Sequence, residues 1–276
     1  MIDEIFIDIA VNPTHFTFEN GDLDYDLIDF MVNKSKNNGV LPVFIGTDAK
    51  TSEQVKVLAD YYDCYCYVGI HPNSVLLNVD DHLSELTSLE YLIENDNNNR
   101  IIGIGECGLD TYRNKENYEK QLIIFEKQLE LFKKYDLPFF FHLRDCDEMS
   151  CDSDFINLLK KYKINKGVVH SFTGKLDTMF NIIQLGLYIG INGISMKLGI
   201  DIVKELPLER MLIETDSPFC LIRKSWVAAN YLDQVIKARN NCPSYIYQIC
   251  EVISKIKGIK YEVVRRTVYQ NTKNLF

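Results

Sequence analysis

The chain is 276 residues long, and its 46% hydrophobic and 25% charged residues are typical of globular proteins rather than disordered or collagen-like chains. Its 30 Lys and Arg against 39 Asp and Glu give a formal charge of −9, whereas proteins held to nucleic acid by bulk charge are usually basic. If the chain acts on a polyanion, a bound divalent cation is the obvious group to offset phosphate charge locally.

Short hydrophobic runs, each typical of a buried strand, alternate along the chain with stretches of helical periodicity. The runs are Glu4–Val11, Val40–Ile45, Cys64–Ile70, Arg100–Gly105, Leu137–Phe141, Gly167–Val169, Leu187–Ile191 and Arg210–Ile213. The helical stretches include Leu23–Met31, Asp80–Asn95, Leu122–Phe132, Glu148–Tyr162, Lys175–Leu185, Tyr245–Ile256 and Tyr261–Thr272. Strand and helix alternating eight times over ~250 residues predict an α/β fold, a TIM (β/α)8 barrel. No linker divides the chain, so we expect one domain over residues 1–276.

Polar residues that suit metal binding lie near the ends of these runs, where a barrel of this kind carries its active site. They are Asp8, His71, Glu106, His142, His170 and Asp216. A glutamate, two histidines and an aspartate supply mixed nitrogen and oxygen ligands, which suit Zn, Mn, Fe or Co better than Mg. Glu106 on a central strand is well placed to bridge two ions, and Asp216 could orient a water molecule and take its proton.

Each of these residues also has a simpler explanation when it is considered alone. A histidine at a strand end is more often a hydrogen-bonded core or loop residue, and Glu106 could pair with Arg113 or Arg144. Asp216 could cap the turn before Ser217-Pro218. The metal-site hypothesis depends on such residues recurring at equivalent strand ends, because unpaired buried charges there would be costly. His15 and His82 show no such placement and are expected at the surface.

Five motifs, in order, resemble those of TatD-type metal-dependent deoxyribonucleases, within the amidohydrolase-like barrel superfamily. The motifs are Gly103–Asp110 (GIGECGLD), His142 with Arg144-Asp145, Val169–Gly174 (VHSFTG), Tyr188–Gly193 (YIGING) and Leu212–Pro218 (LIETDSP). The resemblance runs from Phe6 to the end of the chain. It implies a TIM barrel, one or two divalent metal ions (Mg, Mn or Zn) and hydrolysis of DNA phosphodiesters, usually as a 3′→5′ exonuclease. It also implies that Glu106, His142, His170 and Asp216 are the metal and catalytic residues.

Two departures from the family pattern concern the site. Many members open the first strand with Asp-x-His-x-His, whereas this chain has Asp8-Ile9-Ala10-Val11-Asn12 and most resembles a subgroup that shares this form. We therefore expect one weak metal site, which would depend on Glu106, Asp216 and Asp8. After the last strand, Asn241 replaces the carboxylate of the family's Arg-Asn-Glu-Pro, which bears on substrate contacts there.

Three residues are candidates for contacting a DNA substrate, with single-stranded or frayed ends preferred. His71 could hydrogen-bond to phosphate, and Arg113 and Arg144 could grip it, although each arginine could instead pair with Asp110 or Asp145. Two other functions stay open: hydrolysis of a small amide, lactone or ester on the same barrel, and a catalytically degenerate binding protein.

The cellular setting follows from what the sequence lacks. No apolar run approaches the ~18–20 residues that span a bilayer, and the first residues do not form a secretory signal. The eight scattered cysteines are expected to be reduced thiols. We expect a cytoplasmic protein, also compatible with the nucleus, with no membrane partner and no obligate protein partner.

Overall fold

In a computed structural model, the structure describes residues 6–76, 78–197 and 199–276. The chain forms two compact units. Unit 1 comprises residues 1–44, 171–176 and 189–274, and unit 2 comprises residues 45–170, 177–188 and 275–276. Residues 4 and 5 of the first predicted strand lie outside the described residues. Within the described ranges, no helix is long and apolar enough to cross a bilayer.

Unit 1 is built on parallel strands from both ends of the chain. Strand β1 pairs with β2 and β7 pairs with β8, while a bridge between Val11 and Ser217 joins the end of β1 to the segment after β8. The strands are β1 (Phe6–Val11), β2 (Val40–Ile45), β7 (Tyr188–Ile191) and β8 (Met211–Ile213). The helices are α1 (Tyr25–Asn37), α7 (Asp201–Glu205), α8 (Ile246–Lys257) and α9 (Tyr261–Leu275).

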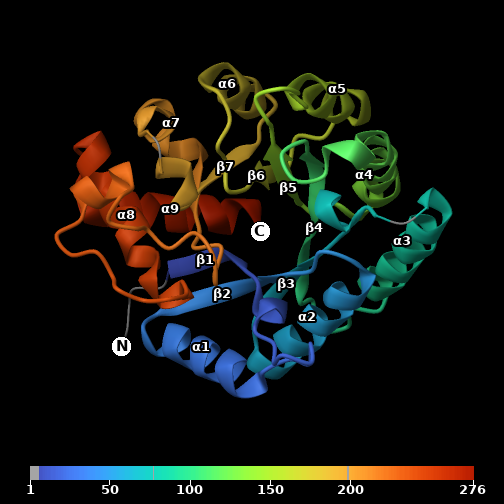
Figure 1. Cartoon of the computed structure of the whole chain (residues 1–276), viewed down its shortest axis with the longest axis horizontal. Coiled ribbons are helices and arrows are strands. Elements are labelled where there is room, and N and C mark those ends of the chain that lie inside the picture. Colours follow the sequence, from blue (N-terminus) through green and yellow to red (C-terminus); the bar gives the residue numbers. More distant parts are fainter. Residues whose placement is uncertain (1–5, 77, 198) are drawn as a thin grey trace. The chain divides into compact units, whose positions relative to one another are not determined.

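Unit 2 holds four parallel strands that pair in chain order. They are β3 (Tyr65–Val68), β4 (Ile101–Asp110), β5 (Phe139–Arg144) and β6 (Gly167–Val169). Its helices are α2 (Ala49–Tyr62), α3 (Val79–Glu94), α4 (Tyr118–Phe132), α5 (Asp152–Tyr162) and α6 (Leu176–Gln184). Helices α3, α4 and α5 lie along the outer side of this sheet and cover that face of the strands (Figure 1).

All eight predicted runs contain a strand, but two helices had no predicted counterpart. Helix α2 begins with a capping box, in which the Asp48 carboxylate accepts from Thr51 N and the Thr51 hydroxyl reaches back to Asp48 N. The spacing of Asp48 and Thr51 in the sequence is a signal that could have located this helix. Helix α7 has only five residues, too few for a periodic pattern.

Strand β5 is buried on both faces, which explains its unbroken hydrophobic sequence. The Phe139 and Phe141 rings stack on one side, and Phe141 meets Phe125 of α4 and Phe155 of α5. Phe140 stacks on the Tyr67 ring of β3 with 4.3 Å between ring centroids. Because side chains alternate along a strand, residues 142 and 144 project from the same face as Phe140.

Strand β4 is longer than predicted, because it continues through Glu106 to Asp110. Ile104 pairs with Phe139 and Cys107 with Phe141, so two residues of β4 lie opposite one residue of β5. This bulge contains Gly105 and Glu106, and a bulge re-aims the side chains that it carries. A Cβ atom on Gly105 would lie 2.2 Å from the Phe140 carbonyl oxygen, so only glycine allows this approach.

Replacing Gly105 should therefore destabilise unit 2. We expect Gly105→Ala to lower the free energy of unfolding by about 3 kcal/mol, because backbone rather than a flexible side chain would have to move. Urea denaturation followed by circular dichroism measures the change. Gly199→Ala is the control, since a Cβ atom there meets no atom within 4 Å. Equal stability of the two variants would contradict the role of the bulge.

A buried carboxyl group joins β1 to the segment after β8 in unit 1. Asp8 is fully buried, and its Oδ1 atom accepts from Thr215 N at 2.9 Å. Burial raises the pKa of Asp8 to about 8, against the opposing effect of its hydrogen bonds with Thr215 and Ala10. The folded chain consequently holds a proton on Asp8 at pH values where the unfolded chain has lost it.

This proton makes stability depend on pH. Between the unfolded pKa of 3.8 and the folded pKa of about 8, the folded state binds more protons, so rising pH lowers stability. Asn mimics the protonated carboxyl group, so the stability of Asp8→Asn relative to the natural chain should rise by roughly 1 kcal/mol per pH unit from pH 5 to 7. Urea denaturation at each pH, in the presence of a chelator, checks this. Parallel pH profiles would show that Asp8 does not titrate in this way.

Candidate metal centre

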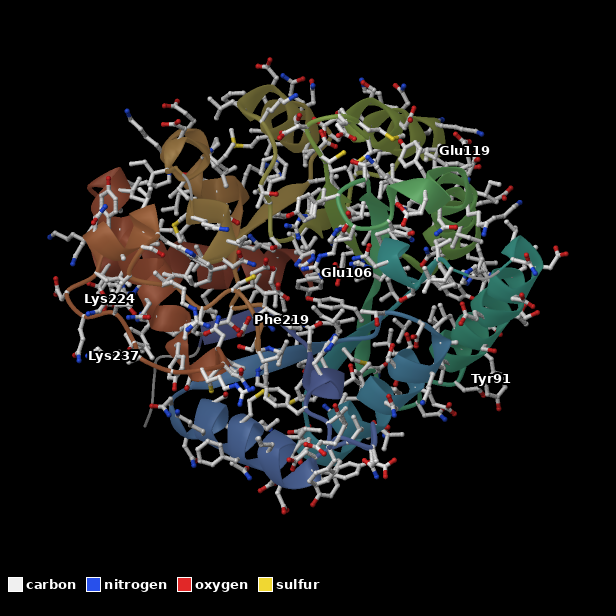
Figure 2. All side chains as sticks on the ribbon, viewed as in Figure 1. Tyr91, Glu106, Glu119, Phe219, Lys224 and Lys237 are labelled. Atoms are coloured by element: carbon white, nitrogen blue, oxygen red, sulfur yellow. The ribbon has the colours of Figure 1, made fainter. Side chains whose placement is uncertain are left out.

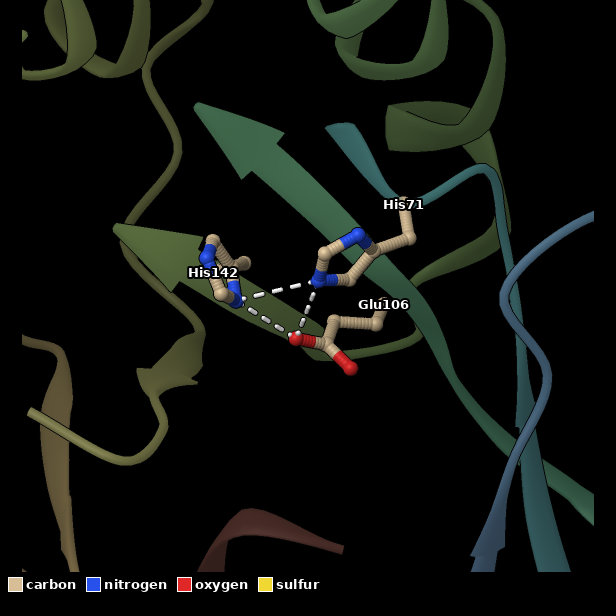
Figure 3. Close-up of side chains that lie close together, drawn as sticks. All are labelled: His71, Glu106 and His142. Carbon is tan, nitrogen blue, oxygen red and sulfur yellow. Dashed lines mark hydrogen bonds and ion pairs between the residues drawn. The ribbon is translucent and has the colours of Figure 1, made fainter. Parts of the chain in front are cut away.

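The Glu106 carboxylate lies at the centre of three imidazole rings in unit 2. Its Oε1 atom is 2.6 Å from His170 Nε2, 2.7 Å from His142 Nδ1 and 3.1 Å from His71 Nε2. Glu106 comes from the bulge of β4 and His142 from β5, while His170 directly follows β6 and His71 lies three residues beyond β3. Figure 3 shows His71, Glu106 and His142 facing one another across the strand ends.

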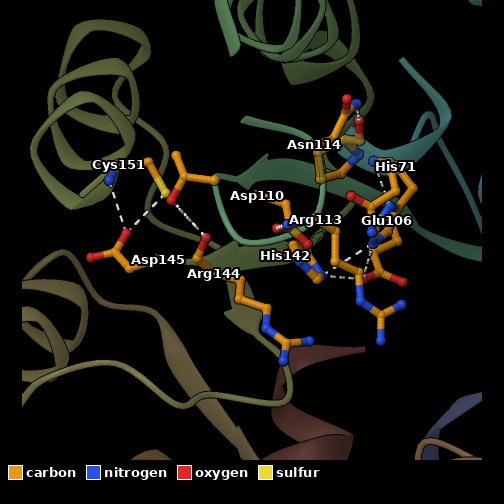
Figure 4. Close-up of polar contacts among 12 residues, drawn as sticks. His71, Glu106, Asp110, Arg113, Asn114, His142, Arg144, Asp145 and Cys151 are labelled. Carbon is orange, nitrogen blue, oxygen red and sulfur yellow. Dashed lines mark hydrogen bonds and ion pairs between the residues drawn. The ribbon is translucent and has the colours of Figure 1, made fainter. Parts of the chain in front are cut away.

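Asp110 fixes the orientation of the His142 ring. The Asp110 Oδ2 atom lies 3.0 Å from His142 Nε2, and Oδ1 accepts from Arg113 N at 2.7 Å (Figure 4). Because an ionised carboxylate can only accept, His142 donates from Nε2 to Asp110 and from Nδ1 to Glu106, and Nδ1 is the atom that can give up its proton and offer a lone pair to a cation. A carboxylate that orients an imidazole in this way is typical of histidines that bind metals. Sequence analysis missed this role, although Asp110 ends the GIGECGLD motif.

His71 faces Glu106 with its other ring nitrogen, Nε2. Its Nδ1 atom accepts a hydrogen bond of 2.9 Å from Asn73 N, so a neutral ring carries its proton on Nε2. That Nε2–H group points at Glu106 Oε1 and at His142 Nδ1, each 3.1 Å away. In this state His71 is a hydrogen-bond donor and has no lone pair on Nε2 for a metal. Its place outside the ligand set stays a prediction.

The charges of the cluster follow from burial and from the neighbouring groups. Burial would raise the pKa of Glu106, but His170 and His71 outweigh burial and hold this pKa well below its ordinary value. Burial is likewise overcome at Asp110, whose hydrogen bond with His142 lowers its pKa to about 2. Burial lowers the pKa of His71. At His142, the hydrogen bonds to Asp110 and Glu106 outweigh burial and raise the pKa of the ring. The two ionised carboxylates of the cluster favour a cation.

The donor set fits a divalent metal ion. Glu106 offers a carboxylate oxygen, His142 can offer the Nδ1 lone pair by giving up its proton, and His170 Nε2 lies on the same oxygen of Glu106. Mixed nitrogen and oxygen donors suit Zn, Mn, Fe or Co. The ligand atoms that Glu106, His142 and His71 could offer lie within 4.8 Å of one another, close enough to surround one ion if His71 Nε2 gives up its proton.

Both predicted substrate-contacting arginines lie beside this cluster. Arg113 follows β4 and Arg144 ends β5, and their guanidinium groups extend to the same side of the drawn residues (Figure 4). The alternative ion pairs with Asp110 or Asp145 are not formed. Asp110 binds His142, and Asp145 accepts from Ser150 Oγ and Cys151 N. Among the described residues, neither guanidinium group has a carboxylate partner.

Asp216 lies in unit 1, three residues beyond β8, in a tightly held turn. Its Oδ1 atom accepts from Asn12 Nδ2 at 2.9 Å, and its Oδ2 atom lies 3.2 Å from Cys220 Sγ. Its backbone is left-handed, with φ +56°, a conformation that non-glycine residues rarely adopt and that is frequent at functional sites. Asn12, which stands where many family members have histidine, is thus a donor to Asp216.

The remaining predicted positions have clear structural partners. Asp8, a predicted ligand of the weaker site, binds Thr215 N and the Thr215 hydroxyl group. Asn241, the second departure, donates to the Thr215 carbonyl oxygen and so holds the turn that carries Asp216. The expectation that His82 lies at the surface was wrong. His82 is 1% exposed and binds Glu85 through Nδ1.

Comparisons with known proteins identify the family of the chain. The family model described as TatD related DNase matches residues 7–276. A protein of Enterocytozoon bieneusi, named as a homolog of the deoxyribonuclease TATDN1, is 41% identical over 98% of this chain and 94% of its own. The 3′-5′ ssDNA/RNA exonuclease TatD of Escherichia fergusonii is 32% identical over 98% of each chain.

The solved structure of a TatD family hydrolase from Entamoeba histolytica superposes with a TM-score of 0.85 at 29% identity, covering 99% of this chain and 98% of that one. With the strands following one another in the order β1 to β8, this match confirms the predicted TIM (β/α)8 fold. The full-length family match and the relatives at 32% and 41% identity show that the chain belongs to the TatD family of deoxyribonucleases.

Proposed function

We propose that this protein is a metal-dependent deoxyribonuclease that removes nucleotides from the 3′ ends of single-stranded DNA. The observation that carries the proposal is the Glu106 carboxylate ringed by three imidazoles, with the guanidinium groups of Arg113 and Arg144 beside it and no carboxylate bound to either among the described residues. The E. fergusonii relative is named a 3′-5′ ssDNA/RNA exonuclease, which supports the direction of cleavage and the single-stranded substrate.

In this proposal Glu106, His142 and His170 hold one divalent cation, with Mn, Zn or Mg as the candidates. Bound there, the cation would supply positive charge beside the phosphate and acidify a water molecule. Asp216 is the proposed further ligand, and a second ion stays a prediction that would draw on Glu106, Asp216 and Asp8. We expect the second ion to be the weaker of the two, because Ala10 and Asn12 stand where many family members have histidines.

The protein's own groups would bind the phosphate and move the proton. The Nε2–H group of His71 donates to a non-bridging phosphate oxygen, and Arg113 and Arg144 offset the remaining charge. Asp216 accepts the proton of the attacking water, a role supported by its motif and by the fixed orientation of its carboxylate. The water oxygen bonds to phosphorus as the bond to the 3′ oxygen breaks. The products are a nucleoside 5′-monophosphate and a strand one nucleotide shorter.

Loss of the Glu106 charge should abolish this activity. We expect Glu106→Gln to reduce the cleavage rate on the order of 1,000-fold, because the amide neither anchors the cation nor balances the imidazoles. Single-stranded oligonucleotides labelled at the 5′ or the 3′ end, incubated with Mg²⁺, Mn²⁺, Zn²⁺ or EDTA, show the rate, the direction and the metal requirement together.

Glu119→Gln is the matched control, since Glu119 is an exposed glutamate on α4, at the outside of the molecule (Figure 2). It should cleave as the natural chain does. Cleavage by Glu106→Gln at the natural rate, or cleavage in EDTA, would contradict the proposed site. No cleavage of DNA by the natural chain with any metal would favour a small-molecule hydrolase instead.

The hydrogen bond from His142 to Asp110 should strengthen metal binding. We expect Asp110→Ala to weaken the affinity for Mn²⁺ or Zn²⁺ by roughly 10- to 100-fold, because the His142 ring loses the partner that fixes its tautomer. Asp110→Asn keeps an acceptor oxygen and should lose less. Calorimetric titration measures the affinity, and Asp147→Asn, at an exposed position, controls for general loss of negative charge. Unchanged affinity in Asp110→Ala would show that Asp110 does not orient His142.

A further inference from the structure

An arginine and a tyrosine stack on each other at the ends of the two strands that carry the metal centre. The Arg144 guanidinium carbon lies 4.3 Å from the centroid of the Tyr112 ring. The stack is built on paired backbone, since Asp110 of β4 lies opposite Arg144 of β5 and Thr111 N donates to Arg144 O at 2.9 Å. The pairing of β4 with β5 therefore fixes where Tyr112 and Arg144 begin relative to the metal centre on the same two strands.

Tyr112 remains open to solvent although the guanidinium group lies over its ring. Its side chain is 60% exposed. Other exposed tyrosines of unit 2, Tyr61 and Tyr91, lie on α2 and α3, and Figure 2 shows Tyr91 on the outside of the molecule, away from Glu106. Tyr112 instead comes two residues after the last residue of β4, at the end of the sheet that bears the imidazoles.

The stack lies close to the groups that would act on a phosphate. Arg144 is two residues beyond His142 on the same face of β5, a separation of about 7 Å along the strand. Asp110, which binds His142, is two residues before Tyr112. An ionised guanidinium group and an aromatic face thus stand next to the metal centre, in the combination that binds single-stranded nucleic acid.

Arg144 also retains its charge for an anion. Asp145, its neighbour in the chain, is occupied by Ser150 Oγ and Cys151 N, and in the described part of the chain Arg144 meets a ring rather than a carboxylate. With a formal charge of −9, the net charge of the protein does not favour DNA binding. Stacking is a source of affinity that does not depend on net charge.

We propose that Tyr112 and Arg144 form a stacking platform for one nucleobase, that of a nucleotide flanking the cleaved phosphodiester. The inference rests on the proposed function and extends it to a base-binding subsite. The base stacks on the Tyr112 ring, while the guanidinium group covers the ring and contacts the adjacent phosphate. A ring face accepts any base, but it requires an unpaired one, so the platform selects single strands without selecting sequence.

The test compares ring removal with base removal. We expect Tyr112→Ala to raise KM for a single-stranded oligonucleotide by about 5- to 100-fold, with a smaller change in kcat. Tyr112→Phe keeps the ring and should behave as the natural chain, as should Tyr91→Ala, which removes an exposed tyrosine elsewhere. Two further oligonucleotides each carry one abasic nucleotide, one on the 5′ side and one on the 3′ side of the cleaved bond. One of the two should raise KM for the natural chain, and the same oligonucleotide should not raise KM further for Tyr112→Ala.

Two outcomes would overturn the platform. Unchanged KM in Tyr112→Ala would do so, and so would an equal loss on base-containing and abasic substrates, which would show that Tyr112 only supports Arg144. A measurement of DNA binding in the absence of cleavage distinguishes failure of the platform from failure of the proposed function. In EDTA, the fluorescence of a 2-aminopurine oligonucleotide should be quenched by the natural chain and by Tyr112→Phe but not by Tyr112→Ala. Equal quenching by all three overturns the platform, whereas absence of DNA cleavage by the natural chain overturns the proposed function.

Discussion

At the centre of unit 2 the carboxylate of Glu106 is buried to 4% exposure, and an isolated buried charge would be very unfavourable. Three imidazoles compensate for it by converging on a single oxygen atom. Their convergence requires that neighbouring parallel strands end at one level and that the bulge in β4 turn Glu106 toward them. Gly105, Asp110 and the strand register can all be understood as conditions for placing this one carboxylate among its partners.

His71 and His142, two of the three histidines beside Glu106, show how neighbouring groups determine what an imidazole can do. Asn73 N donates to His71, so the His71 ring is a hydrogen-bond donor to Glu106. Asp110 accepts from His142, so the His142 ring is a potential metal ligand. A list of residue types cannot make this distinction. It depends on which ring nitrogen faces which backbone or carboxylate group, and that is fixed only when the strands and the turns after them are in place.

Much of the fold was predictable because parallel strands covered on both faces leave unbroken hydrophobic runs, as in β5 and β6. The motif residues Glu106, His142 and His170 were predictable from their places at the ends of those runs, and the structure brings all three together. The extension of β4 through Glu106 was not, because glycines and a glutamate resemble a strand end when the bulge is unknown. The role of Asp110 also depends on the pairing of β4 with β5, which no local sequence pattern reports. The burial of His82 was not predicted either, because it depends on a hydrogen bond between its imidazole and Glu85.

Strand β5 carries core and site residues at alternate positions. Phe139, Phe141 and Leu143 belong to one face, and Phe140, His142 and Arg144 to the other. A single residue inserted or deleted within the strand would exchange the two sets, bringing the imidazole among the phenylalanine rings and a phenylalanine to the metal centre. Both the packing of the core and the geometry of the metal centre therefore constrain the length of this strand. In this segment, variation that leaves the core intact is free to occur beyond Arg144, in the loop that leads to α5.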